Sequence, residues 1–379
     1  MEETVLRDVL YLRENRIIEK GDLRIRDGVF QELNPNSANL PDTELEGRSF
    51  LIPGLVDLHS DAIEKSVEPR PNTFFPLDMA LRALDRRILS GGITTLFNAL
   101  SFAGPELGFR NPASAVETIE KLDAIRPDLK ARHRIHLRYE ISDAESVERI
   151  VALLESKRVS ILSFMNHIPG QGQFSEDYDY VRYLMLTYSK TEREARNLLR
   201  RKFGALEGAH ERVATIARHC RAHQVPMACH DLEDPHQVHH WNALGISFAE
   251  FPTRLESARA CKAGDLLTLF GAPNIIRGES SGSGVKAMDA LEAGVADGIC
   301  SDYFPECLLP AIGIISKEGR VPFPSAVAMV SSVPARIANL SDRGEIAAGK
   351  RADFLVVSMD NTRISLHETW VGGVCVHKG

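Results

Sequence analysis

The tripeptide His59-Ser60-Asp61 follows an apolar run, residues 51–58, that has the composition of a buried strand. In a β-strand, residues two apart point to the same face, so an imidazole and a carboxylate would leave the end of this run side by side. Both groups are common ligands of divalent first-row metal ions. The spacing therefore predicts one part of a metal centre.

Four more potential ligands stand where other strand-like runs end: Glu140, His167, His230 and Asp302. With the first pair they provide three imidazoles and three carboxylates, which is enough for two ions if Glu140 bridges them. A pair of ions lowers the pKa of the water between them and neutralises charge on the oxygen atoms of the group under attack. We therefore expect a hydrolytic centre with two divalent metal ions, zinc in first place and manganese or iron as alternatives.

Asp302 has a second predicted role. A carboxylate beside the metal can take the proton of the attacking water, so we expect Asp302 to be the general base. His136 and Arg138 stand four and two residues before Glu140 and so share its strand face. We interpret both as interior hydrogen-bonding residues and not as ligands.

The elements that position these residues read as a parallel α/β fold. Between Pro53 and Leu340, apolar strand-like runs alternate with helical segments. The candidate strands are residues 51–58, 94–99, 134–140, 159–165, 227–230, 247–251, 268–271 and 298–300. We predict a (β/α)8 TIM-like barrel spanning residues 53–340, with the ligands at the C-terminal ends of its strands.

Both ends of the chain read as short strands of alternating polarity, in residues 1–52 and 341–379. Neither end has enough apolar surface to be a domain alone, so together they are predicted to form one small β-sandwich. The connection after His167 is unusually long. Beyond Gln171 we expect inserted helices that cap the mouth of the barrel.

Composition narrows the class of protein. The formal net charge of -7 argues against general affinity for nucleic acids or anionic membranes. The first residues lack the features of a signal peptide, and no apolar run is long enough to span a bilayer. The six cysteines form no C-x-x-C pair, which favours buried reduced thiols. We expect a cytoplasmic enzyme, with a homo-oligomer as a reasonable assembly.

Several motifs carry a resemblance to known proteins. Residues 53–59, the ordered ligands and residues 344–353 resemble the amidohydrolase superfamily across nearly the whole chain. Most of that superfamily has His-x-His where this chain has His-x-Asp. More specific segments are residues 59–65, 68–71, 166–171, 249–253, 271–278 and 301–305. This set is similar to the alpha-D-ribose 1-methylphosphonate 5-triphosphate diphosphatase family of the carbon–phosphorus lyase pathway.

The resemblance implies hydrolysis of a ribose 5-triphosphate between its α and β phosphates, with release of diphosphate. It also implies that the six ligands named above hold the metal. The triphosphate needs further positive charge, and Lys65, Arg70 and Arg277 are predicted to bind it. Arg277 precedes a loop rich in glycine and serine, whose backbone N–H groups suit phosphate oxygens, although Glu279 adds negative charge there.

Two alternatives stay open. The same metal centre could hydrolyse a C–N bond, as in a cyclic amidase or a deaminase, because the hydroxide that attacks phosphorus could also attack a carbonyl or amidine carbon. A non-catalytic assembly protein is the other alternative, and the complete ligand set argues against it. The basic residues favour a phosphorylated small molecule as the partner.

Overall fold

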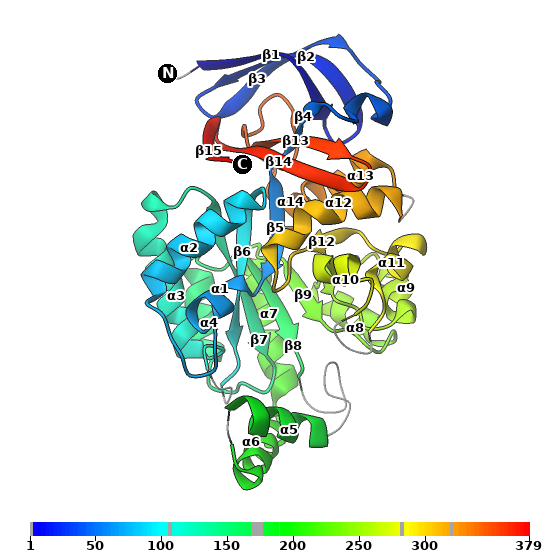
Figure 1. Ribbon diagram of the computed structural model, residues 1–379. Helices are drawn as coiled ribbons and strands as arrows, with labels where there is room; N and C mark the ends of the chain where they lie inside the picture. Colours follow the sequence, from blue (N-terminus) through cyan, green and yellow to red (C-terminus); the bar gives the residue numbers. More distant parts are fainter. Residues whose placement is uncertain (1–2, 105–107, 168–176, 189, 281–283, 319–320) are drawn as a thin grey trace.

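The computed structural model describes residues 3–104, 108–167, 177–188, 190–280, 284–318 and 321–379 (Figure 1). Its centre is a barrel of parallel strands in the order β12-β11-β10-β9-β8-β7-β6-β5. The barrel strands are β5 (Leu55–Ser60), β6 (Ile93–Phe102), β7 (Arg132–Glu140), β8 (Ile161–Met165), β9 (Met227–His230), β10 (Phe248–Glu250), β11 (Leu267–Gly271) and β12 (Gly298–Cys300). The predicted TIM-like barrel is confirmed.

Helices follow the barrel strands and cover the outside of the barrel (Figure 1). In α2, for example, Leu81, Leu84 and Ile88 recur at helical spacing and are fully buried. The helices are α1 (Ala62–Val67), α2 (Leu77–Ser90), α3 (Pro112–Ile125), α4 (Val147–Glu155), α5 (Asp177–Tyr188), α6 (Glu192–Gly204), α7 (Ala209–Ala222), α8 (Gln237–Leu244), α9 (Leu255–Ala263), α10 (Ala272–Arg277), α11 (Ala287–Glu292), α12 (Leu308–Lys317), α13 (Phe323–Ala328) and α14 (Ser332–Ile337).

A second sheet, the terminal sheet, is built from both ends of the chain, as predicted (Figure 1). Its order is β15-β14-β13-β4-β1-β2-β3. The strands are β1 (Glu3–Arg13), β2 (Ile17–Arg26), β3 (Val29–Ser37), β4 (Ser49–Pro53), β13 (Phe354–Asp360), β14 (Arg363–Val371) and β15 (Val374–Lys378). Tyr11, Leu23, Phe30 and Phe354 belong to one buried cluster within it, which joins residues from both chain ends.

The apolar run 51–58 is not one strand. It is divided at Gly54 into the end of β4, in the terminal sheet, and the start of β5, in the barrel. The Gly54 N–H donates to the carbonyl of Asp353 at 2.9 Å. A Cβ atom at this position would collide with the side chain of Thr94, so only glycine fits where the chain passes between the two sheets.

The barrel closes between β5 and β12 through a short set of hydrogen bonds. Asp57 is fully buried and accepts from the Ser301 N–H at 3.0 Å and from the Ser301 hydroxyl at 2.5 Å. One step further along, the Asp302 N–H donates to the His59 carbonyl at 3.0 Å. The Asp61 N–H donates to the Asp302 carbonyl at 2.8 Å. The closure therefore brings three of the predicted ligands to the same place.

Replacing Asp57 with alanine is expected to lower the free energy of unfolding by about 3 kcal/mol, because it removes a buried carboxylate that accepts two hydrogen bonds from Ser301 and leaves the Ser301 hydroxyl only its contact with Ser60. Urea unfolding followed by circular dichroism measures the change. The matched control is Ser301→Ala, which removes one hydroxyl donor and should lower stability by only about 1 kcal/mol. Equal losses in the two variants would contradict the proposed role of Asp57 in closure.

The predicted insertion contains two packed helices, α5 and α6. Thr191 and Glu194 form a capping box at the start of α6, which satisfies N–H groups that the helix itself cannot. Figure 1 shows the pair at the end of the barrel opposite the terminal sheet, the end toward which the barrel strands run. Residues 168–176, where the insertion begins, lie outside the described residues.

Two further expectations concern the buried reduced thiols and the lack of a membrane-spanning segment. All six cysteines are free thiols; five are buried, and Cys375 is half-buried. Among the described residues, no helix combines the length and the apolar character needed to cross a bilayer.

Candidate metal centre

Two ligand clusters lie at the C-terminal ends of the barrel strands. The first cluster consists of His59, Asp61 and Asp302, and the second of His167, His230 and Asp231. In each cluster the potential ligand atoms lie within 4.8 Å of one another. The structure therefore brings five of the six predicted ligands together in two groups. Asp231 was not predicted, although it directly follows His230 in the sequence.

The first cluster owes its geometry to the start of the barrel and its closure. His59 stands near the end of β5, and Asp61 directly precedes α1. Asp302 follows β12 and has a φ of 55°, a left-handed conformation that is uncommon for a residue with a side chain. The Ser60–Asp302 bridge and the hydrogen bonds of the closure hold it there.

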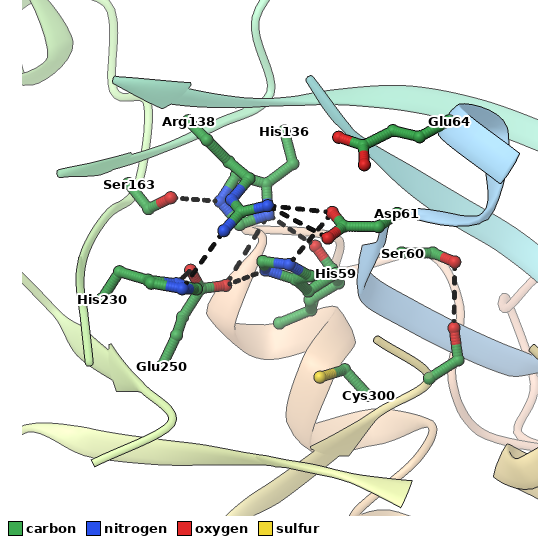
Figure 2. Close-up of polar contacts among 12 residues, drawn as sticks. His59, Ser60, Asp61, Glu64, His136, Arg138, Ser163, His230, Glu250 and Cys300 are labelled. Atoms are coloured by element: carbon green, nitrogen blue, oxygen red, sulfur yellow. Dashed lines mark hydrogen bonds and ion pairs between the residues drawn. The ribbon is translucent and has the colours of Figure 1, made fainter. Parts of the chain in front are cut away.

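Glu250, at the end of β10, lies between the two clusters (Figure 2). One carboxylate oxygen is 3.0 Å from Nδ1 of His59, and the other is 3.2 Å from Nδ1 of His230. His59, His230 and Glu250 form a third group of potential ligands, whose atoms also lie within 4.8 Å of one another. Because both oxygens already face Nδ1 atoms, we interpret Glu250 as the carboxylate that orients both rings and leaves Nε2 of each to face the centre.

The residues of the first cluster fit a divalent metal ion. Nε2 of His59 is buried and has no hydrogen-bond partner among the described residues. It lies 3.5 Å from Oδ1 of Asp61, which is long for a hydrogen bond but suits two ligands of one ion. Burial lowers the pKa of His59, but the carboxylates of Glu250 and Asp61 outweigh it and raise the pKa to about 10. The surroundings favour positive charge at this position, and a metal ion supplies it.

Glu140 belongs beside the second cluster. Its carboxylate lies 3.4 Å from Nδ1 of His167 and accepts from the His167 N–H at 3.2 Å. It also lies 3.7 Å from Nζ of Lys202, a fully buried side chain from α6. Among the residues that the structure describes, Glu140 contacts neither His59 nor Asp61. Its role as a bridge between two ions stays a prediction.

The two residues interpreted as interior groups do make hydrogen bonds inside the barrel. His136 contacts the Leu58 carbonyl at 2.8 Å and the Ser163 hydroxyl at 3.0 Å. Burial lowers its pKa to about 4, so the ring is neutral at physiological pH. Arg138 lies between Asp61 and His230 and contacts both (Figure 2).

The three predicted phosphate-binding residues are all exposed. Lys65 lies in α1 and Arg70 follows it, and neither side chain forms an ion pair with any described residue. Arg277 ends α10, pairs with Glu279 at 2.8 Å, and hydrogen-bonds Tyr303, the neighbour of Asp302. Arg110 was not predicted: it contacts Glu64 at 2.7 Å and Asp61 at 3.4 Å.

Replacing Glu250 with glutamine is expected to weaken metal binding about 10–100-fold, the usual cost of losing a carboxylate that orients ligand histidines. Competition with a chromophoric chelator measures the affinity. The matched control is Glu64→Gln, since Glu64 is also buried beside the first cluster but contacts Arg110 and no histidine. An unchanged affinity in the Glu250 variant would refute the orienting role.

Sequence comparison gives two matches. A model of the amidohydrolase family matches residues 301–377, a segment that includes Asp302, β13, β14 and all but the last residue of β15. The chain is 31% identical over 378 residues to the alpha-D-ribose 1-methylphosphonate 5-triphosphate diphosphatase of Escherichia coli (strain K12). That alignment covers 97% of this chain and 99% of the relative.

Solved structures share the fold at low sequence identity. A 5-methylcytosine deaminase from Klebsiella pneumoniae, liganded with phosphonocytosine, is 13% identical with a TM-score of 0.66, covering 99% of this chain and 98% of that one. A prolidase complexed with n-methylphosphonate-l-proline is 14% identical with a TM-score of 0.64, covering all of both chains. At these identities the likeness concerns the fold alone.

Proposed function

The chain belongs to the alpha-D-ribose 1-methylphosphonate 5-triphosphate diphosphatase family of the amidohydrolase superfamily, and we propose that it shares the activity for which that family is named. The reaction is the hydrolysis of a ribose 5-triphosphate between its α and β phosphates, which yields the 5-phosphate and diphosphate. The full-length similarity to the Escherichia coli relative carries this proposal. We place the reaction in the cytoplasm, where the free thiols of the chain stay reduced.

The cations around the two clusters support a substrate rich in phosphate. Lys65 lies on the helix that begins directly after Asp61, and Arg70 lies just beyond the same helix. Arg277 reaches Tyr303, next to Asp302, from the end of α10, the helix that follows β11. Guanidinium and ammonium groups bind phosphate oxygens by charge-assisted hydrogen bonds. A triphosphate that extends from the first cluster toward these side chains would meet positive charge along its length.

Metal ions at the clusters would activate water and neutralise charge on the phosphate under attack. The imidazole and carboxylate ligands suit zinc, with manganese or iron as alternatives. Asp302 is proposed as the general base. Burial and the neighbouring Asp61 carboxylate raise the pKa of Asp302 to about 6, which makes it a better proton acceptor than an ordinary carboxylate.

Phosphorus NMR of the metal-loaded protein with alpha-D-ribose 1-methylphosphonate 5-triphosphate tests the proposal. We expect resonances of diphosphate and of a 5-phosphate sugar to appear. Release of monophosphate would show that the other anhydride bond is cleaved. An unchanged spectrum with metal present would refute the proposed substrate and give priority to C–N hydrolysis, which release of ammonia or opening of a cyclic amide would detect.

Replacing Arg277 with glutamine is expected to raise KM for the triphosphate about tenfold, the equivalent of one charge-assisted hydrogen bond of about 1.4 kcal/mol. Steady-state kinetics and metal analysis of the same sample measure it. The matched variant is Glu279→Gln, which releases Arg277 from its partner and should lower KM by a few-fold at most. Loss of metal from the Arg277 variant would instead make it a structural residue.

A further inference from the structure

Arg138 connects the two ligand clusters (Figure 2). It stands on β7, is 4% exposed, and points into the barrel between His136 and Glu140. Its Nη1 lies 3.0 and 3.1 Å from the two carboxylate oxygens of Asp61, in the first cluster. Its Nη2 lies 3.2 Å from Nε2 of His230, in the second cluster. One fixed positive charge therefore already occupies the space between the clusters.

The contact with His230 decides what the second cluster can bind. Nδ1 of His230 faces Glu250 at 3.2 Å, so Nδ1 carries the ring proton and Nε2 carries the lone pair. That single lone pair faces an Arg138 N–H. It cannot accept this hydrogen bond and also bind a metal ion.

The first cluster has no such conflict. Nε2 of His59 has no hydrogen-bond partner among the described residues. Arg138 contacts both carboxylate oxygens of Asp61, and Arg110 lies 3.4 Å from one of them, but a carboxylate has about four lone-pair positions and can bind a metal ion as well. Asp302 adds the third ligand. Of the two clusters, the first therefore keeps a lone pair for a metal ion on each of its three side chains while Arg138 is in place.

We infer that the centre binds a single divalent ion at His59, Asp61 and Asp302, and that the Arg138 guanidinium takes the place of the second ion. The inference rests on the metal dependence in the proposed function and deepens it. A guanidinium is always charged in proteins and matches phosphate oxygens, so it can neutralise charge on a phosphoryl group as an ion would. Glu140 then orients His167 and bridges no ions.

Metal stoichiometry tests this inference without reference to activity. Protein is loaded with excess Mn²⁺, freed of unbound metal by gel filtration, and analysed by mass spectrometry of the metal. We expect about one ion per wild-type chain. Arg138→Met frees Nε2 of His230 and should raise the ratio to about two. The matched control is Arg110→Met, which removes the other arginine that contacts Asp61 and leaves the contact between Arg138 and His230 in place. This variant should still bind about one ion per chain.

Two tightly bound ions in the wild-type protein would overturn the inference, and so would a ratio of one in a folded Arg138 variant. If that variant does not fold, as judged by circular dichroism, electron paramagnetic resonance of the wild-type Mn²⁺ protein decides. The hyperfine sextet of an isolated ion supports a single metal, and the multiline spectrum of a coupled pair contradicts it. Absence of diphosphate release would refute the proposed substrate but would leave the stoichiometry unaffected.

Discussion

Replacing Asp302 with asparagine is expected to lower kcat about 10²–10⁴-fold, the usual contribution of a positioned general base. Asparagine keeps the size of the side chain and one oxygen ligand, but it cannot take a proton. The backbone hydrogen bonds of Asp302 to His59 and Asp61 do not involve the side chain, so the closure of the barrel should survive. Single-turnover kinetics at saturating substrate, with metal content measured on the same sample, give the loss in the chemical step.

The pH profile separates loss of a base from a general loss of structure. Burial first, and then Asp61, raise the pKa of Asp302 to about 6, whereas a bound cation acts in the opposite direction. Because a general base must be ionised, the wild-type rate should fall as the pH drops through this pKa, at or below about pH 6. The asparagine variant should lack this decline. Near-wild-type turnover in a metal-loaded variant would rule out Asp302 as the base.

Removal of the metal is expected to lower turnover at least about a thousandfold. Activation of water and stabilisation of charge by an ion contribute several kcal/mol, and each 1.4 kcal/mol is a factor of ten in rate. The fold should survive, because the barrel core consists of apolar side chains such as Leu58, Phe97 and Phe248 that no ion holds together. Dialysis against a chelator, followed by kinetics and thermal unfolding, measures both effects.

Adding metal back to the metal-free protein distinguishes a catalytic ion from an incidental one. Adding Zn²⁺ or Mn²⁺ back should recover turnover in the wild-type protein but not in His59→Asn, which lacks the imidazole with the open Nε2. Circular dichroism of the His59 variant checks that it is folded. Full activity of the chelated protein would contradict both the metal site and the proposed reaction.

The sequence was most informative about the barrel strands and the ends at which the ligands stand. Strands buried on both faces of a parallel sheet appear as continuous apolar runs, and a polar residue at the end of such a run is conspicuous. The same rule failed at residues 51–58, because the end of β4 and the start of β5 are both buried and equally apolar. Only the packing of Gly54 against Thr94 shows where one sheet ends and the other begins.

Other parts of the centre have no local pattern that would reveal them. Lys202 reaches Glu140 from helix α6, and Arg110 reaches Asp61 from a loop. Each pair is far apart in sequence, so only the fold brings it together. Glu250 ends a strand and could have been proposed as a ligand. Its orienting role depends on which ring nitrogens it faces, and spacing in a sequence contains no such information. Contacts between charged residues that are distant in sequence are therefore the part of the metal centre that could not be predicted from the sequence.

The position of β4 has a consequence for the order in which the protein is made and folded. β4 pairs with β13 on one side and with β1 on the other, and only Gly54 separates it from the strand that carries His59. β13 begins at Phe354, near the end of the 379-residue chain. On the ribosome, the sheet beside the first ligand strand cannot be completed until β13 has been made, long after β5. The first ligand strand thus gains both of its supports, β12 in the barrel and β13 beside β4, only after most of the barrel has been made.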